Sequence, residues 1–311
     1  MPPLSRAQGE GPGVRAPETA EEAQMSRSIA HSPGSVAHTD AAASVCAVCG
    51  RVHQEAEIAL LSRLWVYTNY DCNLHCSYCL VSSSPRTPRR GLPLETFCRL
   101  IDEAVALGCA EVFLTGGEPA ILPHIADMVV YATPRLRTTM LTNGMLWKGP
   151  RLARLEAVNH PNLTLQVSLD SGTPDLHDYY RGPGTWAKTV EGITTLRARG
   201  FRVRTGTTET MHSRRRLREL QEFLTSIGIP PEDQIVRPLA RRGESRHGAV
   251  LEMPDLVPEL TVDVDGVYWH PVAPAADMRL TPTIFPLRAA VEKAEHLWHQ
   301  MGGQRRARVF R

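Results

Sequence analysis

The chain has 311 residues, 42% hydrophobic and 22% charged, which excludes a fully disordered chain, a collagen and a coiled coil. Its 35 basic and 33 acidic residues leave a net charge of +2, so charge indicates neither a nucleic-acid nor a membrane partner. No apolar run approaches the roughly 18 residues of a membrane span. No basic start followed by an apolar core marks a secretory signal, so we expect a cytoplasmic protein.

The N-terminal part contains two segments of different character. Residues 1–44 are rich in Pro, Gly, Ala, Ser and Glu and bury too little surface to offset chain entropy, which predicts a disordered tail. The lead-in over residues 45–61 carries Cys46 and Cys49, with His53, in the pattern CxxCxxxH. That pattern is typical of part of a zinc site, while an unliganded pair and a redox-active pair also fit it.

From residue 62 to residue 240, short strand-like runs alternate with amphipathic helical runs. Strands are predicted over residues 64–69, 111–115, 138–143, 163–170, 203–209 and 234–239. Helices are predicted over residues 93–108, 121–133, 150–158, 185–199 and 213–228. This alternation favours a parallel sheet with right-handed crossovers. Six units are too few to close an eight-stranded barrel, so we expect an open or partial barrel, or a doubly wound sheet, with its chemistry at the carboxyl ends of the strands.

Residues 241–311 are predicted to form a C-terminal extension that covers the barrel mouth. Within it, residues 260–264 and 267–270 flank Asp265-Gly266, a strong turn signal that predicts a hairpin. A last helix is predicted over residues 287–301. His270, at the end of the hairpin, could contact a substrate or a metal, or simply lie at a strand edge.

Three cysteines, Cys72, Cys76 and Cys79, form the pattern CxxxCxxC directly after the first predicted strand. A structural zinc site is closed by four ligands, whereas this loop offers three thiolates and no clear fourth ligand. Three thiolates suit a [4Fe–4S] cluster, because they hold three irons and leave the fourth open. These cysteines are therefore the candidate catalytic and metal-binding residues.

Three further motifs fall at the ends of later strands. They are Gly116-Gly117-Glu118-Pro119, Thr142-Asn143-Gly144 and Ser168-Leu169-Asp170. Each motif alone is weak, since two glycines after a strand usually form a tight turn. On one rim of a parallel sheet, however, they would form a polar cup around the cysteine loop.

With these residues the sequence resembles the radical S-adenosylmethionine (SAM) superfamily over residues 62–240. Tyr78 before the last cysteine, the GGEP motif and the stretch SLDSGTPDLHDYYRG carry the resemblance. The last stretch is similar to the branch of the molybdenum-cofactor, PQQ-synthesis and peptide-modifying enzymes. The resemblance implies an α/β fold with a partial (β/α)6 barrel, and a [4Fe–4S] cluster and SAM as cofactors. It also implies a flavodoxin or ferredoxin as electron donor, and a 5′-deoxyadenosyl radical that takes hydrogen from a small-molecule or peptide substrate in cofactor, natural-product or peptide maturation.

The same resemblance implies roles for the residues of the cup. The three cysteines would ligate the cluster and Tyr78 would lie against the adenine. Glu118 would accept a hydrogen bond from the methionine ammonium, and Ser168 and Asp170 would bind the ribose. Glycine would let the backbone approach the methionine end closely. The other predicted SAM contacts are Gly116, Gly117, Pro119, Thr142 and Asn143.

The sequence departs from that branch because it has no cysteine after Cys109, where many relatives carry seven or more for auxiliary clusters. We therefore predict a single cluster. Two other functions stay open: a non-catalytic sensor that binds the cluster and SAM, and a zinc-binding regulatory protein. His177, Asp178 and Arg181, which follow the fourth strand, would lie near the substrate or the SAM carboxylate, or belong to a loop that caps the helix at residue 185. Arg237, on the sixth strand, could contact the SAM carboxylate or an anionic substrate.

Overall fold

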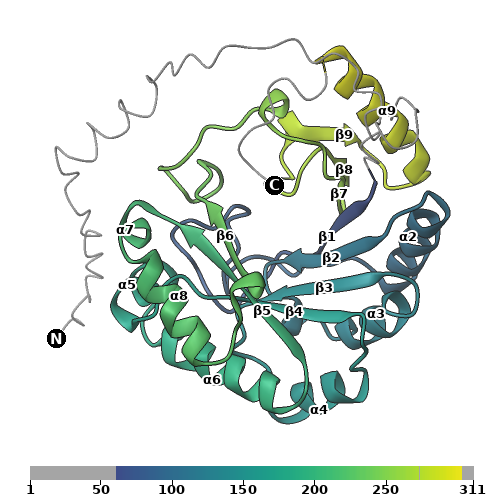
Figure 1. Ribbon diagram of the computed structural model, residues 1–311. Coiled ribbons are helices and arrows are strands. Elements are labelled where there is room, and N and C mark those ends of the chain that lie inside the picture. The colour runs from purple at the N-terminus through teal and green to yellow at the C-terminus, as the bar shows by residue number, and fades with distance from the viewer. Residues whose placement is uncertain (1–60, 273, 303–311) are drawn as a thin grey trace, which may run out of the picture. The chain divides into compact units, whose positions relative to one another are not determined.

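The computed structural model describes residues 61–272 and 274–302 (Figure 1). Six strands follow one another along the chain: β1 (Arg63–Asn69), β2 (Glu111–Gly116), β3 (Arg137–Thr142), β4 (Leu163–Ser168), β5 (Arg202–Glu209) and β6 (Gln234–Pro238). Each pairs in parallel with the next, so their carboxyl ends share one rim. The predicted α/β fold with a partial barrel of six units is confirmed.

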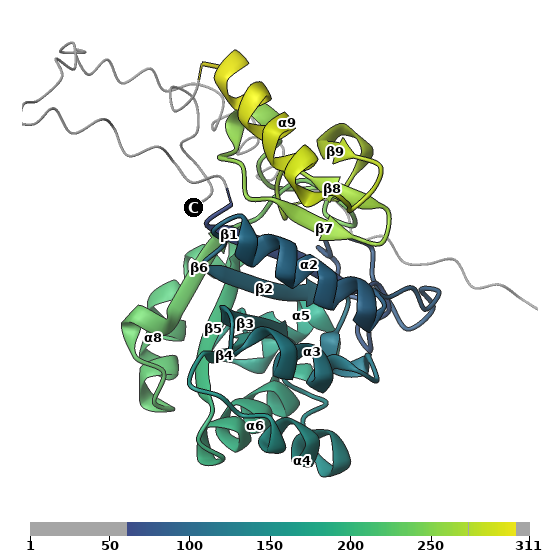
Figure 2. The same cartoon turned by 90° about the vertical axis from the view of Figure 1, so that its right-hand side faces the viewer.

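Helices cover the outer face of this sheet (Figures 1 and 2). They are α2 (Leu94–Ala106), α3 (Ile125–Ala132), α4 (Gly149–Ala157), α5 (Pro174–Arg181), α6 (Thr185–Ala198), α7 (Met211–Arg214) and α8 (Leu217–Ser226). In α2, Phe97, Leu100, Ile101 and Ala104 recur at spacings of three and four and are buried. Burial of each large apolar side chain contributes about 1.5–3 kcal/mol. The core therefore lies between the helices and the sheet.

The alternation along β1 shows how the sheet positions a site. Leu64 and Val66 are fully buried in the core, whereas Trp65 and Tyr67 line a cavity on the other face. Successive side chains of a strand point to opposite faces, so one strand serves both the packing and the site.

Two helical segments differ from the prediction. Residues 174–181 form α5, with Pro174 in its first turn and Arg181 in its last, where a capping loop was one of the two expectations. The expected capping is present, because Asp178 accepts from the N–H groups of Gly184 and Trp186 at the start of α6, but it comes from a helix and not from a loop. The helix expected over residues 213–228 is divided into α7 and α8, because Thr210 and Ser213 form a capping box that starts a separate short turn.

The C-terminal extension continues the sheet beside β1. The predicted hairpin is present as β7 (Thr261–Asp263) and β8 (Gly266–Tyr268), and β7 pairs in parallel with β1. A third strand, β9 (Arg279–Thr281), was not predicted and pairs with β8. The last helix, α9 (Leu287–Gln300), packs on α2 and β9 (Figure 2). In the described ranges, no helix is long and apolar enough to cross a membrane.

Candidate active site

A cavity of about 310 Å³ lies inside the sheet at the carboxyl ends of its strands. Ten of the twelve residues predicted for the cysteine loop and the cup line it, namely Cys72, Cys76, Tyr78, Cys79, Gly116, Gly117, Glu118, Thr142, Asn143 and Ser168. Pro119 and Asp170 do not line it. The structure therefore brings the motifs of β1 to β4 together around one space.

The cysteine loop presents three free thiols to this cavity. Backbone N–H groups donate to two of the sulfurs, from Leu74 to Cys72 at 3.4 Å and from Ser83 to Cys79 at 3.2 Å. Burial raises the pKa of Cys72 to about 12 and that of Cys76 to about 11. The cavity wall thus disfavours free thiolates, and bound cations would offset that cost.

The three thiols are arranged around the cavity. Across the described residues, no three His, Cys, Asp or Glu side chains are grouped so that they could hold one metal ion. In a [4Fe–4S] cluster each cysteine ligates a different iron, whereas all ligands of a zinc ion coordinate the same metal atom. Three free thiols of one loop that line one cavity match the donor set of such a cluster.

The two glycines at the end of β2 are required by the cysteine loop. A Cβ on Gly116 would lie 2.2 Å from the Asn69 carbonyl oxygen, and one on Gly117 would lie 2.2 Å from that of Asp71. The Gly117 N–H donates to the Asn69 carbonyl at 2.8 Å. We expected glycine to allow close approach to a ligand. The structure shows that it allows the end of β2 to lie directly against the start of the loop.

Glu118 is a buried carboxylate that joins the ends of β2 and β3. Its Oε1 accepts from the Thr142 hydroxyl at 2.7 Å and from the Ala120 N–H at 3.1 Å, and its Oε2 accepts from the Asn143 N–H at 2.7 Å. Burial raises the pKa of Glu118, and these donors oppose that rise. Asn143 also donates to Asn73 of the cysteine loop at 2.8 Å. Among the described residues Glu118 has no ion-pair partner, so its charge is open to a cationic ligand group.

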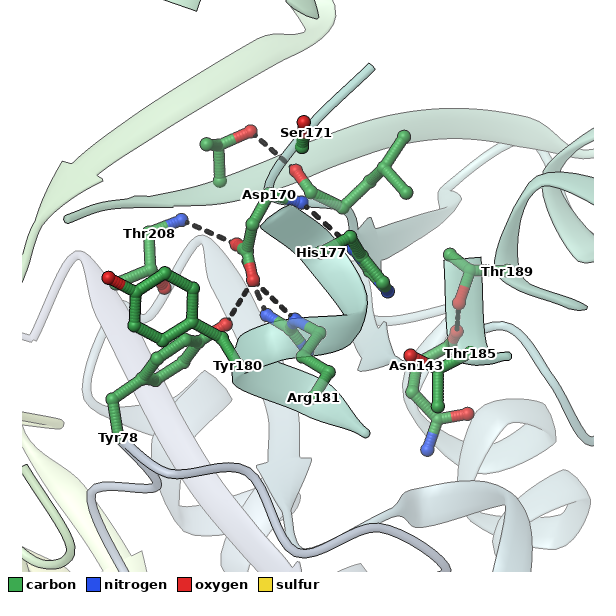
Figure 3. A network of polar contacts seen from close by, with 12 residues as sticks. Tyr78, Asn143, Asp170, Ser171, His177, Tyr180, Arg181, Thr185, Thr189 and Thr208 are labelled. Atoms are coloured by element: carbon green, nitrogen blue, oxygen red, sulfur yellow. Dashed lines mark hydrogen bonds and ion pairs between the residues drawn. The ribbon is translucent and has the colours of Figure 1, made fainter. Parts of the chain in front are cut away.

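Asp170 lies at the centre of a buried polar network (Figure 3). Its carboxylate accepts from the Tyr78 hydroxyl, from Arg181 Nε at 2.6 Å and from the Thr208 N–H at 3.0 Å. Burial alone would raise the pKa of Asp170, but the Arg181 guanidinium holds it below its ordinary value. We predicted that Asp170 contacts the ribose, and that contact stays a prediction. In the structure Asp170 does not line the cavity but fixes Tyr78 and Arg181, which do.

Sequence reasoning missed several residues that line the cavity. Trp65 and Tyr67 on β1 and Gln166 on β4 face it from inside the sheet, and Glu259 reaches it from the extension. The two-residue periodicity of the strands could have indicated the first three. The predicted zinc ligands Cys46 and Cys49 lie outside the described residues.

The chain belongs to the radical SAM superfamily, whose family model matches residues 66–227, more than half of its length. It is 33% identical over 159 residues to the AdoMet-dependent heme synthase of Methanosarcina barkeri, covering 50% of this chain and 45% of that protein. It is 32% identical over 219 residues to the mycofactocin maturase MftC of Mycobacterium tuberculosis, covering 70% of this chain and 49% of that protein. The chain thus spans less than half the length of either relative.

The fold is also similar to a solved structure, that of Streptococcus suis SuiB bound to the precursor peptide SuiA. The TM-score is 0.53 at 21% identity, covering 62% of this chain and 43% of that chain. At this identity the likeness is one of fold.

Proposed function

We propose that this chain is a radical SAM enzyme that holds one [4Fe–4S] cluster on Cys72, Cys76 and Cys79 and binds SAM beside it. The observation that carries the proposal is that three free thiols of one loop line the same cavity as the buried carboxylate of Glu118. When bound, the cluster and SAM supply reductive cleavage of a carbon–sulfur bond of SAM and removal of a hydrogen atom from a substrate.

The residues of the cavity wall would contact the methionine end of SAM in different ways. Glu118 would accept from the methionine ammonium, because it is a buried carboxylate without a cationic partner in the described chain. Gly116, Gly117, Thr142 and Asn143 would shape this end of the cavity. This proposal is supported by two observations. The two glycines let the end of β2 lie against the cysteine loop, and Thr142 and Asn143 donate hydrogen bonds to Glu118.

The adenosine end of SAM would lie against Tyr78 and Ser168. Tyr78 is held by its hydrogen bond to Asp170, so its ring orientation is set before ligand binds. Ser168 lies at the end of β4 and lines the cavity. In this proposal Asp170 acts through Tyr78.

The chain would divide into the N-terminal tail at residues 1–44, the lead-in at 45–61, the barrel at 62–240 and the extension at 241–311. The extension would cover the cavity mouth and exclude water from it. Supporting this role, Glu259, His270, Pro271 and Val272 line the cavity. The Tyr67 hydroxyl also donates to the Pro271 carbonyl at 2.8 Å, which fixes the extension to β1. Exclusion of water protects a reactive species from side reactions.

We propose a substrate in peptide or cofactor maturation and a flavodoxin or ferredoxin as electron donor. The relatives named as a mycofactocin maturase and a heme synthase support this class of substrate, as does the fold shared with a peptide-bound protein. Because the chain covers only part of each relative, the particular reaction is not transferred from either one.

The test is anaerobic reconstitution with iron and sulfide, followed by addition of dithionite and SAM. The proposal predicts about four irons per chain and formation of 5′-deoxyadenosine, measured by mass spectrometry. Cys76→Ala should abolish the product. Cys98→Ala, which removes a cysteine of α2 outside the cavity, should retain it. Zinc without iron would favour the regulatory protein, and a cluster without SAM cleavage would favour the sensor.

A further inference from the structure

Arg237 is a cation of the cavity wall that the described chain leaves without a partner. It belongs to β6, opposite Thr208 of β5, and its guanidinium lies 5.4 Å from the centre of the Trp65 ring. Within the described ranges, that guanidinium makes no hydrogen bond and no ion pair. Arg237 is half-buried, and a cation that faces a cavity without a hydrogen-bond partner is typical of a site for an anion.

The other charged groups of the cavity wall do have partners. Arg181 is paired with Asp170 at 2.6 Å. Glu259 accepts from Trp65 Nε1 at 2.6 Å and lies 3.4 Å from Arg63.

Glu118 accepts from three neutral donors and, in the proposed function, faces the SAM ammonium. Glu259 is the opposite charge that acts on Arg237, but it makes no ion pair with it. Among the described cations of the wall, Arg237 is therefore the one whose donors are free to bind an anion.

His270 adds a second unused donor to the same cavity. Its Nδ1 accepts from the Val272 N–H at 3.1 Å, which assigns the ring proton to Nε2. Burial, and to a smaller extent the charge of nearby Arg237, lowers the pKa of His270 to about 3, so the ring is a neutral donor. The neighbouring Trp269 is fully buried and donates to the Leu256 carbonyl at 3.1 Å, which fixes the backbone at this point.

We propose that Arg237 and His270 bind a carboxylate of the substrate. This inference rests on the proposed function, and it names the chemical class that the cavity selects. A guanidinium can donate two parallel hydrogen bonds to a carboxylate, and Nε2–H of His270 supplies a third. One free positive charge matches a monoanion, whereas a phosphate dianion would keep an uncompensated negative charge.

The carboxylate of SAM is the other possible source of this anion. In the proposed function the methionine end of SAM lies at Glu118, between β2 and β3. Arg237 lies on β6, and its guanidinium packs on the ring of Trp65, which is near the start of β1 and not at its carboxyl end. This position, away from the ends of β2 and β3, favours the substrate over SAM.

The test uses small probes on the reconstituted protein with SAM bound. Acetate and acetamide have nearly the same shape and differ in charge, and their binding is measured by saturation-transfer NMR. We expect acetate to bind at least tenfold more tightly than acetamide and more tightly than inorganic phosphate. Arg237→Met should weaken acetate binding at least tenfold, and His270→Phe should weaken it severalfold.

The matched control is Arg204→Met, which removes a half-buried arginine of β5 that is already paired with Gln166 at 2.9 Å. It should leave acetate binding within twofold of wild type. Arg237→Lys keeps the charge and loses the planar fork, so it should weaken acetate binding less than Arg237→Met. This variant also keeps the proposal testable if Arg237→Met does not fold.

Three results would overturn the inference: acetate binding that is unchanged in Arg237→Met, equal binding of acetate and acetamide, or tighter binding of phosphate. A tenfold loss of SAM affinity in Arg237→Met would also overturn it, because the guanidinium would then serve the SAM carboxylate. Failure of the proposed function is distinguishable, since it would appear as absence of 5′-deoxyadenosine from the wild-type protein.

Discussion

Replacing Asp170 by asparagine tests whether the network behind Tyr78 is as buried and as charged as the structure shows. The side chain of Asp170 is 1% exposed and that of Arg181 is 10% exposed, with 2.6 Å between Oδ2 and Nε. Removal of one partner from such a pair leaves an uncompensated charge and costs about 3–5 kcal/mol. Asp170→Asn keeps the shape and removes the charge, so its free energy of unfolding should fall by about that amount.

The assay is urea unfolding followed by circular dichroism. Arg181→Met should cost a similar amount, and the double variant should lose clearly less than the sum of the two, because neither charge remains. The control is Glu222→Gln in the exposed pair with Arg218, which should cost at most about 0.5 kcal/mol.

The pH dependence gives a second readout of the same pair. The pKa of Asp170 is lower in the folded chain than its ordinary value of 3.8. The stabilisation is therefore complete above pH 3.8 and is lost as the pH falls through the folded-state pKa. The difference between wild type and Asp170→Asn should accordingly be constant near neutral pH and shrink in acid. A cost below about 1 kcal/mol, close to that of an exposed pair, would refute the reasoning.

Three further predictions concern packing and protonation. Gly117→Ala should lower the iron content after reconstitution, since its Cβ would lie 2.2 Å from the backbone of the cysteine loop; full iron content would contradict this. Gly192→Ala in α6 should destabilise the fold by about 1–3 kcal/mol despite the better helix propensity of alanine, because its Cβ would lie 2.1 Å from the Gly144 carbonyl. A raised melting temperature would contradict that expectation. Burial lowers the pKa of His177 to about 4 and that of His270 to about 3. The unfolded chain therefore gains protons that the folded chain does not, and stability should fall as the pH drops below about 6.5. Urea unfolding at pH 7 and pH 5 measures this loss of unfolding free energy. The loss should be smaller in His177→Phe than in the wild type, and an equal loss in the two proteins would contradict the account.

The fold was predictable where a pattern is local. Strands such as β2 and β4 follow from short β-rich runs, and α2 follows from apolar residues three and four positions apart. The motifs at the ends of these strands were expected on one rim, because parallel strands end on the same side. By contrast, β9 has only three residues, which is too few to show a period.

The site was predictable where a motif is contiguous and less so where distant residues meet. The cysteine loop and Glu118 were found from spacing. The contact between Tyr78 and Asp170 joins residues 92 positions apart, and the pairing of Asp170 with Arg181 depends on the formation of α5. No local signal indicates that the carboxylate of Asp170 is buried against Tyr78 and Arg181. For Arg237 and His270 the sequence left several roles open, because their surroundings come from β1 and the extension.

The central claim is that Cys72, Cys76 and Cys79 hold a [4Fe–4S] cluster whose fourth iron is open to SAM. The most direct measurement is the electron paramagnetic resonance spectrum of the reconstituted, dithionite-reduced protein with and without SAM. The account predicts a reduced-cluster signal that SAM shifts in the wild type and in Cys98→Ala, and that is lost in Cys76→Ala. A chain that binds no iron, or a cluster signal that SAM leaves unchanged, would contradict it.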